Sequence, residues 1–552
     1  MAASLSFGKS PLIKRIVLHI LFEILYHNLR FDATVYSQIN GRIGRLARFR
    51  LDKKGQIVYY LGVNKLRGEI MEFQRQDLHS AEKVLENMNA MNACGLRLTG
   101  SEGQRAYCEM LKRQIREMGL EVFEKEYRFD RWEATSSSLT VDGEEIHVSS
   151  EFPYSGLTGP EGVTGRLVEV GNHPLGFQKA RGKIGVCHIK NLSKISSKVA
   201  FDMRKAVPET LEIEKSYRGP VSTVFVKTLL TFWSAKLAGM KGMVCIWEDM
   251  SEAMVEGQWL NFILGYLKVP MLWVNETEGK KLIAAAKAKK SATLTLNGFI
   301  EKDALTESFY TVVKGTGDTG EAIIVNAHTD GCNFSEENGG VAMLSMLSYF
   351  VKHPIKRNLI FVFVTGHFRL PKFRTGFDQA TSRWLADNKK VWKDKSGKHG
   401  GYKVVAGCAV EHLGCTEWKD VNGEYVKTND IDAEIVYTGN KVMDDIYYAA
   451  TDGRTMLRTY TLRGHNLMHF GEGQPLFNKK IPEIALVTAP DYLCAVDKTG
   501  GHHMDKFNLP LMVEQIETFT KCVMLIDEKS AKELGKPQGY SLGLGKLKMK
   551  KK

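Results

Sequence analysis

The sequence lacks any long uninterrupted apolar run. The best candidate, residues 16–25, is broken by His19 and Glu23, whereas a membrane-spanning helix needs about 18 or more consecutive apolar residues. No small-residue cleavage site follows this stretch, which argues against a signal peptide. We therefore expect a protein without a membrane span, located in the cytoplasm.

Cysteine is also scarce. Only nine of the 552 residues are cysteines, an odd number, and no two of them have the CxxC spacing. These features argue against a disulfide framework and against a zinc site built from thiolates. This cysteine usage fits a reducing compartment.

The central part of the chain has no excess of charge of either sign. The net charge of +13 comes from the ends, since residues 1–75 hold 13 basic and 5 acidic side chains and residues 541–552 hold five lysines. The residues between these ends carry 58 basic and 58 acidic side chains. A basic recognition face is not indicated, so we expect no nucleic acid partner.

The remaining composition, 43% hydrophobic and 25% charged, is typical of a globular protein. Short continuous apolar runs at 322–326, 358–364, 404–410 and 484–487 predict strands that are buried on both faces. A helical pattern at 341–351 lies between the first two runs. The sequence therefore predicts an α/β fold with a mostly parallel central sheet flanked by helices.

Residues 150–300 show a different pattern, with short β segments separated by glycine and proline. Because the α/β alternation resumes after them, we predict an inserted, mostly β domain. The predicted organisation is a basic N-terminal extension of unknown role at 1–75, an α/β domain at 76–149 and 301–530, the insertion at 150–300, and a basic tail at 531–552.

Imidazoles and carboxylates follow the predicted strands. They are His328 and Asp330 after the first strand, Glu336 before the helix, His367 after the second strand, Glu411 and His412 after the third, and His502 and His503 beyond the fourth. Because ligands bind beyond the carboxyl ends of strands in open α/β sheets, we expect these side chains to converge. Their chemistry is that of ligands for zinc or a similar divalent ion.

Several segments resemble the successive site motifs of the co-catalytic zinc aminopeptidases of peptidase family 28, relatives of aminopeptidase Y and glutamate carboxypeptidase. They are AHTDG, EENGGVAML, KRNLIFVFVTG, AVEHLG, and PDYL followed by HHMDKF. The resemblance covers about 76–530. Within the predicted insertion, GKIGVCHI, AGMKGMVCIW and VPMLWVN are similar to the protease-associated domain that these enzymes often carry.

The resemblance implies roles for individual residues. His328 matches a metal-ligating histidine, Asp330 the carboxylate that orients it, Glu336 the metal-bridging aspartate, Glu411 the carboxylate ligand of the second metal, and His502 or, slightly favoured, His503 the last histidine ligand. Gly471-Glu472-Gly473 and Ala489-Pro490-Asp491-Tyr492-Leu493 resemble the substrate-side loop of the family.

The sequence departs from the family at Gly366-His367-Phe368, where the family reads Gly-Glu-Glu. Phe368 cannot bind a metal, so one metal loses a carboxylate. His367 suits a general base near neutral pH or a metal ligand. His412 either offers a spare ligand nitrogen or simply packs.

These matches predict a metal-dependent hydrolase of peptide or related amide bonds, aminopeptidase-like, with His367 as an altered general base. One or two zinc ions, or another divalent metal, would be its cofactor, and a peptide or small amide its substrate. The alternative is a catalytically silent relative that acts as a binding or scaffold protein.

Overall fold

The computed structural model divides the chain into two units, Met1–Phe73 and Gln74–Lys552. It describes residues 47–51, 57–61, 73–170, 174–192, 201–211, 219–227, 239–394, 401–466 and 469–540. In the first unit, β1 (Ala47–Leu51) and β2 (Ile57–Leu61) pair as an antiparallel hairpin. The apolar stretch 16–25 and the lysines of 541–552 lie outside the described residues.

The centre of the second unit is a run of parallel strands. In sheet order these are β13 (Asn358–Val364), β12 (Glu321–His328), β14 (Lys403–Ala409) and β19 (Glu483–Leu486). All residues of β13 and β19 are buried. Continuous burial explains why these segments read as continuous apolar runs, and the four predicted strands are confirmed.

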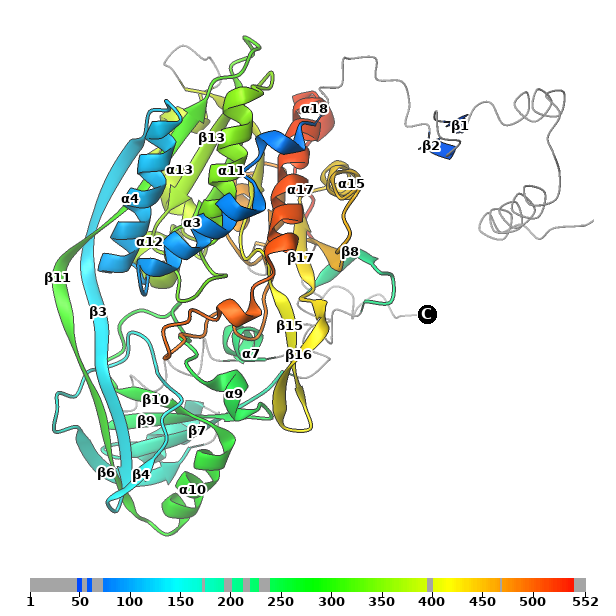
Figure 1. Cartoon of the computed structure of the whole chain (residues 1–552). Helices are drawn as coiled ribbons and strands as arrows, with labels where there is room; N and C mark the ends of the chain where they lie inside the picture. The colour runs from blue at the N-terminus through cyan, green and yellow to red at the C-terminus, as the bar shows by residue number, and fades with distance from the viewer. Residues whose placement is uncertain are drawn as a thin grey trace, which may run out of the picture. The chain divides into compact units, whose positions relative to one another are not determined.

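Helices cover both faces of this sheet. On one face, α11 (Gly339–Lys352) connects β12 to β13 and contacts α3 (Ala81–Ala93), α4 (Glu102–Glu117) and α17 (Leu509–Asp527) (Figure 1). Close approach of α4 requires a glycine at 340, because a Cβ there would lie 2.4 Å from the Tyr107 hydroxyl.

Alternate residues of a strand face opposite sides of its sheet. On β12, the methyl group of Ala327 lies against Gly339 of α11, whereas the side-chain amide of Asn326 donates to Thr381 in α13 (Thr381–Asp387) on the other face. The predicted α/β fold with a mostly parallel sheet flanked by helices is therefore confirmed.

A long antiparallel ribbon extends the sheet away from the central strands. It consists of β3 (Phe123–Val141) and β11 (Ser291–Val313) (Figure 1). The N-terminal end of β11 pairs antiparallel with β6 (Val163–Glu169). Beyond it lie the parallel strands β7 (Ile184–Lys190), β9 (Gly242–Glu248) and β10 (Met271–Val274), with α10 (Glu276–Lys287) against them.

Residues 150–300 do not all lie beyond the ribbon. The segment β8 (Asp202–Val207) pairs antiparallel with β18 (Thr459–Arg463) at the opposite edge of the main sheet. The division into an α/β domain and a protease-associated-like insertion stays a prediction.

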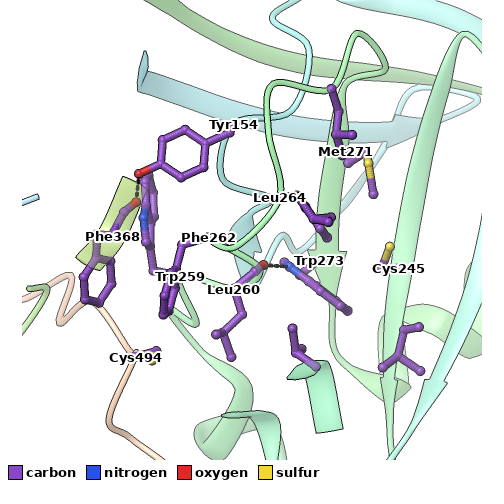
Figure 2. Close-up of a cluster of buried hydrophobic side chains, with 14 of the residues drawn as sticks. Tyr154, Cys245, Trp259, Leu260, Phe262, Leu264, Met271, Trp273, Phe368 and Cys494 are labelled. Carbon is purple, nitrogen blue, oxygen red and sulfur yellow. Dashed lines mark hydrogen bonds between the residues drawn. The ribbon is translucent and has the colours of Figure 1, made fainter. Parts of the chain in front are cut away.

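The apolar core joins the inserted strands to the loop that follows β13. In it, Trp247 stacks on Trp273 with ring centroids 3.9 Å apart. Figure 2 shows the part of this cluster around Trp259, Phe262 and Phe368. Contacts of Phe368 with this cluster shape the candidate site.

The second unit has further described elements. They are η1 (Arg75–Asp77), β4 (Glu144–Ile146), β5 (Ser150–Glu151), η2 (Pro174–Ala180), α7 (Pro220–Lys227), α9 (Glu252–Val255), η3 (His367–Arg369), α12 (Leu370–Phe373), α14 (Lys389–Trp392), β15 (Thr416–Val421), β16 (Glu424–Ile431), β17 (Glu434–Thr438), α15 (Lys441–Ala450), α16 (Gln474–Asn478), η4 (Met504–Lys506) and α18 (Ala531–Leu534). Within the described ranges, none of the helices combines the length and the apolar character that a membrane crossing needs.

Candidate metal centre

His328 is the last residue of β12 and is fully buried. Its Nδ1 lies 2.8 Å from the backbone carbonyl oxygen of Asp330. Because a carbonyl only accepts, Nδ1 carries the proton and Nε2 presents a lone pair. Burial also holds the pKa of His328 well below its usual value, which favours the neutral ring. This is the state in which histidine binds a metal.

His412 follows β14 and has the same arrangement. Its Nδ1 lies 2.7 Å from the carbonyl oxygen of Thr488, so Nε2 again presents its lone pair. Burial lowers the pKa of His412 to about 3. The backbone of His412 is left-handed, with φ of 58°. This turn directs the ring to the same place as His328, and the two ring centroids are 5.9 Å apart.

Glu336 supplies a carboxylate between these histidines. Its Oε2 lies 3.4 Å from Nε2 of His412, and burial and neighbouring acids raise its pKa well above the usual range. The next residue, Glu337, instead forms a buried ion pair with Arg97. Of the two adjacent glutamates, Glu336 is therefore the one directed to the histidines.

His328, Glu336 and His412 form the one group of potential metal ligands found in the described ranges, with ligand atoms all within 4.8 Å of one another. Among the described residues, Nε2 of both histidines and Oε2 of Glu336 are buried without a hydrogen-bond partner. Buried polar atoms are normally partnered, and three unpartnered ligand atoms around one point are what a divalent cation satisfies. The residues present fit a zinc ion.

Glu411 lies beside this group. Its Oε1 accepts a 2.7 Å hydrogen bond from the backbone NH of Glu472, while its Oε2 is 3.9 Å from Nε2 of His412. Burial and the charge of Glu472 raise the pKa of Glu411 well above its usual value. Glu411 is thus adjacent to the ligand group without belonging to it.

His367 forms a pair with Glu472. Its Nδ1 lies 2.8 Å from Oε1 of Glu472 and its Nε2 lies 3.6 Å from Oε1 of Glu336. The ring also stacks on His328, with centroids 4.1 Å apart and planes 10° from parallel. Since a carboxylate only accepts, Glu472 holds the proton on Nδ1 and leaves the lone pair of Nε2 facing the ligand group.

Glu472 has no role in the sequence-based prediction. It is fully buried, and it also accepts backbone hydrogen bonds from Ala380 at 3.2 Å and Thr381 at 2.6 Å. In the sequence, Glu472 is marked only by the glycines on either side of it, at 471 and 473. Glu472 and His367 are 105 residues apart in the chain, so no local sequence pattern indicates that they pair.

Asp330 contacts His328 through its backbone carbonyl, and its carboxylate has a different set of partners. The carboxylate accepts from the backbone NH groups of Gly366, His367 and Phe368 at 3.1, 3.2 and 2.9 Å, and from the Thr99 hydroxyl at 2.5 Å. It therefore fixes the turn that carries His367. This turn requires glycine at 366, where φ is 95°.

Phe368 occupies the position of the missing carboxylate and belongs to the apolar core. Its ring stacks on Phe262 at 4.6 Å, and its carbonyl accepts from the Tyr154 hydroxyl (Figure 2). Because its ring packs in the core, Phe368 contributes no atom to the ligand group.

The structure does not bring His502 or His503 into the ligand group of the described residues. Both have left-handed backbones, with φ of 51° and 57°. The backbone NH of His503 donates to Asp497 at 3.1 Å, and its ring tilts against Tyr492 at 6.4 Å. His412, which the sequence left open as ligand or packing residue, belongs to this group instead.

A narrow cavity of about 50 Å³ adjoins the ligand group. Glu336, His367 and His412 line one part of it, and apolar side chains such as Phe262 and Leu493 line the rest. The volume is far below the roughly 300 Å³ of a typical small-molecule pocket.

Comparison with known proteins gives structural likeness alone. No known protein family and no curated protein matches the sequence. A zinc aminopeptidase from Bacillus subtilis superposes with a TM-score of 0.55 at 15% identity, over 80% of this chain and 94% of that one. An aminopeptidase from Aneurinibacillus sp. gives 0.53 at 15% identity, over 85% and 98% of the two chains.

A peptidase M28 precursor from Shewanella amazonensis gives a TM-score of 0.54 at 12% identity, over 82% of this chain and 95% of that one. At these identities the likeness concerns the fold. The predicted resemblance to the co-catalytic zinc aminopeptidases is therefore confirmed as a shared zinc exopeptidase fold.

Proposed function

We propose that this chain is a metal-dependent hydrolase of peptide or related amide bonds, with one zinc ion held by His328, Glu336 and His412. The observation that carries the proposal is the convergence of their three unpartnered, buried ligand atoms. When bound there, zinc would polarise an amide carbonyl and lower the pKa of water. The fold shared with zinc aminopeptidases supports this chemistry.

The proposed ligand set differs from the one implied by the sequence resemblance. It replaces His502 and His503 by His412 and leaves Glu411 beside the metal, where Oε2 has no hydrogen-bond partner among the described residues. A single ion fits better than two, because Phe368 packs in the apolar core and supplies no second carboxylate.

His367 is the proposed proton acceptor. It lines the cavity next to Glu336, and Glu472 holds its Nδ1 proton so that Nε2 accepts. An imidazole backed by a carboxylate is an effective general base near neutral pH. In this assignment Asp330 positions His367 by holding the backbone of its turn, whereas Glu472 positions the ring.

The proposed substrate is a peptide, or a small amide, that presents its end to the site. The small volume of the cavity, about 50 Å³, favours a substrate that enters by its end. The fold shared with zinc aminopeptidases supports aminopeptidase-type cleavage as the form of hydrolysis we propose.

A binding protein without catalytic activity is the second candidate. The observation that favours it is Phe368, whose ring is built into the core where a metal ligand would be needed for a two-metal site. Location in the cytoplasm and the absence of a nucleic acid partner are further proposals that rest on the sequence.

Hydrolysis assays on zinc-loaded protein would separate the two candidates. The substrates are a panel of amino-acid 4-nitroanilides with free and with acetylated amino groups. We expect hydrolysis of the free forms and a loss of about 10²-fold or more in His367→Ala, with zinc content retained. The matched control is His353→Ala. His353 follows the C-terminal end of α11, pairs with Asp77 at 2.8 Å and does not line the cavity. Folded, zinc-loaded protein that cleaves no member of the panel would favour the binding protein.

A further inference from the structure

A second cavity of about 470 Å³ adjoins the turn that carries His367. We call it the Arg369 cavity. Its charged lining residues are Arg128 and Asp130 of β3, Lys302 and Asp303 of β11, Arg369, and Lys372 of α12. Four of these side chains are basic and two are acidic, so the cavity has a net positive charge.

Both carboxylates of the cavity are already paired. Asp130 contacts the ammonium group of Lys302 at 2.5 Å, and Asp303 contacts the guanidinium of Arg128 at 3.3 Å. The hydrogen bond from Lys302 also lowers the pKa of Asp130. Within the described part of the chain, Arg369 and Lys372 form no ion pair with a carboxylate within 4 Å. The excess positive charge therefore belongs to these two residues.

Arg369 is unusual because it is buried and has no carboxylate partner among the described residues. Only 7% of the residue is exposed. Its guanidinium carbon lies 4.1 Å from the ring centroid of Tyr266 and 4.8 Å from that of Tyr154. Among the described residues, its Nε and Nη1 have no hydrogen-bond partner. Cation–π contacts offset part of the cost of burying this charge, and an anion would offset more.

We propose that the Arg369 cavity binds an oxyanion group, a carboxylate or a phosphate, of a small ligand. A guanidinium that contacts the rings of Tyr266 and Tyr154 and lines the cavity suits charge-assisted hydrogen bonding to such a group. Lys372, which is exposed at the rim, adds a second charge without a fixed geometry. The volume of about 470 Å³ is within the range of small-molecule sites.

The proposal is independent of the proposed hydrolase activity. It connects to the same turn because Arg369 follows His367 and Phe368 directly, and because Tyr154 contacts both Arg369 and the Phe368 carbonyl. Direct binding to the metal-free protein is therefore a sufficient test.

The test is calorimetric titration of the full chain with inorganic phosphate and, separately, with acetate, each against chloride at matched ionic strength and pH 7.5. We expect saturable binding of at least one of the two oxyanions. Arg369→Gln should weaken it about tenfold or more, and Lys372→Gln about two- to fivefold. Arg374→Gln is the matched control, since it removes a nearby arginine that does not line the cavity.

Circular dichroism of each variant shows whether it is folded. Should Arg369→Gln fail to fold, the exposed Lys372→Gln carries the test. Preference for phosphate would assign a phosphoryl ligand, and preference for acetate a carboxylate. The proposal is overturned by the absence of binding beyond that of chloride, or by affinities that are unchanged in the folded cavity variants.

Discussion

Glu472→Gln tests the pairing of Glu472 with His367. The substitution keeps the size of the side chain and replaces one carboxylate oxygen by an amide NH₂ group. In the structure Oε1 accepts from His367 and Ala380, and Oε2 accepts from Thr381. Glutamine has only one acceptor oxygen, so either orientation of its amide sets a donor against a donor.

These contacts determine how much stability and activity Glu472→Gln is expected to lose. A buried donor left without its acceptor costs about 1–3 kcal/mol, and relief of the repulsion between Glu472 and Glu411 offsets part of this loss. We therefore expect the free energy of unfolding to fall by about 1–2 kcal/mol. With the proton of His367 no longer held on Nδ1, we expect kcat to fall about 10²-fold or more.

The assays are urea unfolding of the variant and hydrolysis of the best nitroanilide by zinc-loaded protein, with zinc content measured in parallel. Zinc content should not change, because Glu472 is not in the ligand group. Glu472→Asp, which keeps the charge on a shorter side chain, should retain more activity than Glu472→Gln. A Glu472→Gln protein with wild-type kcat would refute the assigned role.

Three further predictions concern the core, the metal and a buried acid. Phe368→Ala should lower the free energy of unfolding by about 3–5 kcal/mol in urea, since Phe368 is fully buried against Phe262; a cost below 1 kcal/mol would contradict that packing. Zinc added after chelation should raise the melting temperature of the wild type, as a ligand of the folded state does, and should not do so in His328→Ala; equal shifts would argue against the site. Burial raises the pKa of Asp432 to about 7, so the folded state favours the protonated carboxyl group. The protonated Asp432 stabilises the folded protein below about pH 4, and this contribution is lost as the pH rises to 7. Asp432→Asn should therefore be stabilising at pH 8 relative to wild type, with a smaller difference at pH 4, and the reverse trend in chemical unfolding would contradict the assignment.

The sequence was sufficient for the strands and for part of the site. Buried parallel strands have a continuous apolar pattern, and ligand residues at their carboxyl ends follow from the fold class. His328 and Glu336, two members of the proposed ligand set, could be placed at this edge from the sequence, because their positions depend on β12 and on the segment before α11.

The rest of the site depends on loop geometry and distant contacts. His412 turns toward the proposed metal site through a left-handed backbone conformation, which the neighbouring sequence does not predict. The loop before η4 places Leu493 at the cavity, whereas His503 contacts Asp497. The position of His503 after the last strand therefore did not indicate the proposed ligand set.

The sequence also did not predict one long-range strand pairing. β8 lies within the predicted insertion, yet it pairs with β18, more than 250 residues later in the chain. Its sequence gives no indication of this partner, because edge pairing depends on backbone hydrogen bonds that most side chains permit.

The most direct test of the account is the zinc content of the purified protein after dialysis against metal-free buffer, for the wild type, His412→Ala and His503→Ala. We predict close to one zinc per chain in the wild type and in His503→Ala, and loss of zinc in His412→Ala. Retention of zinc in His412→Ala with loss in His503→Ala would contradict the proposed ligand set. A folded wild type that neither contains zinc nor takes it up would contradict the metal centre itself.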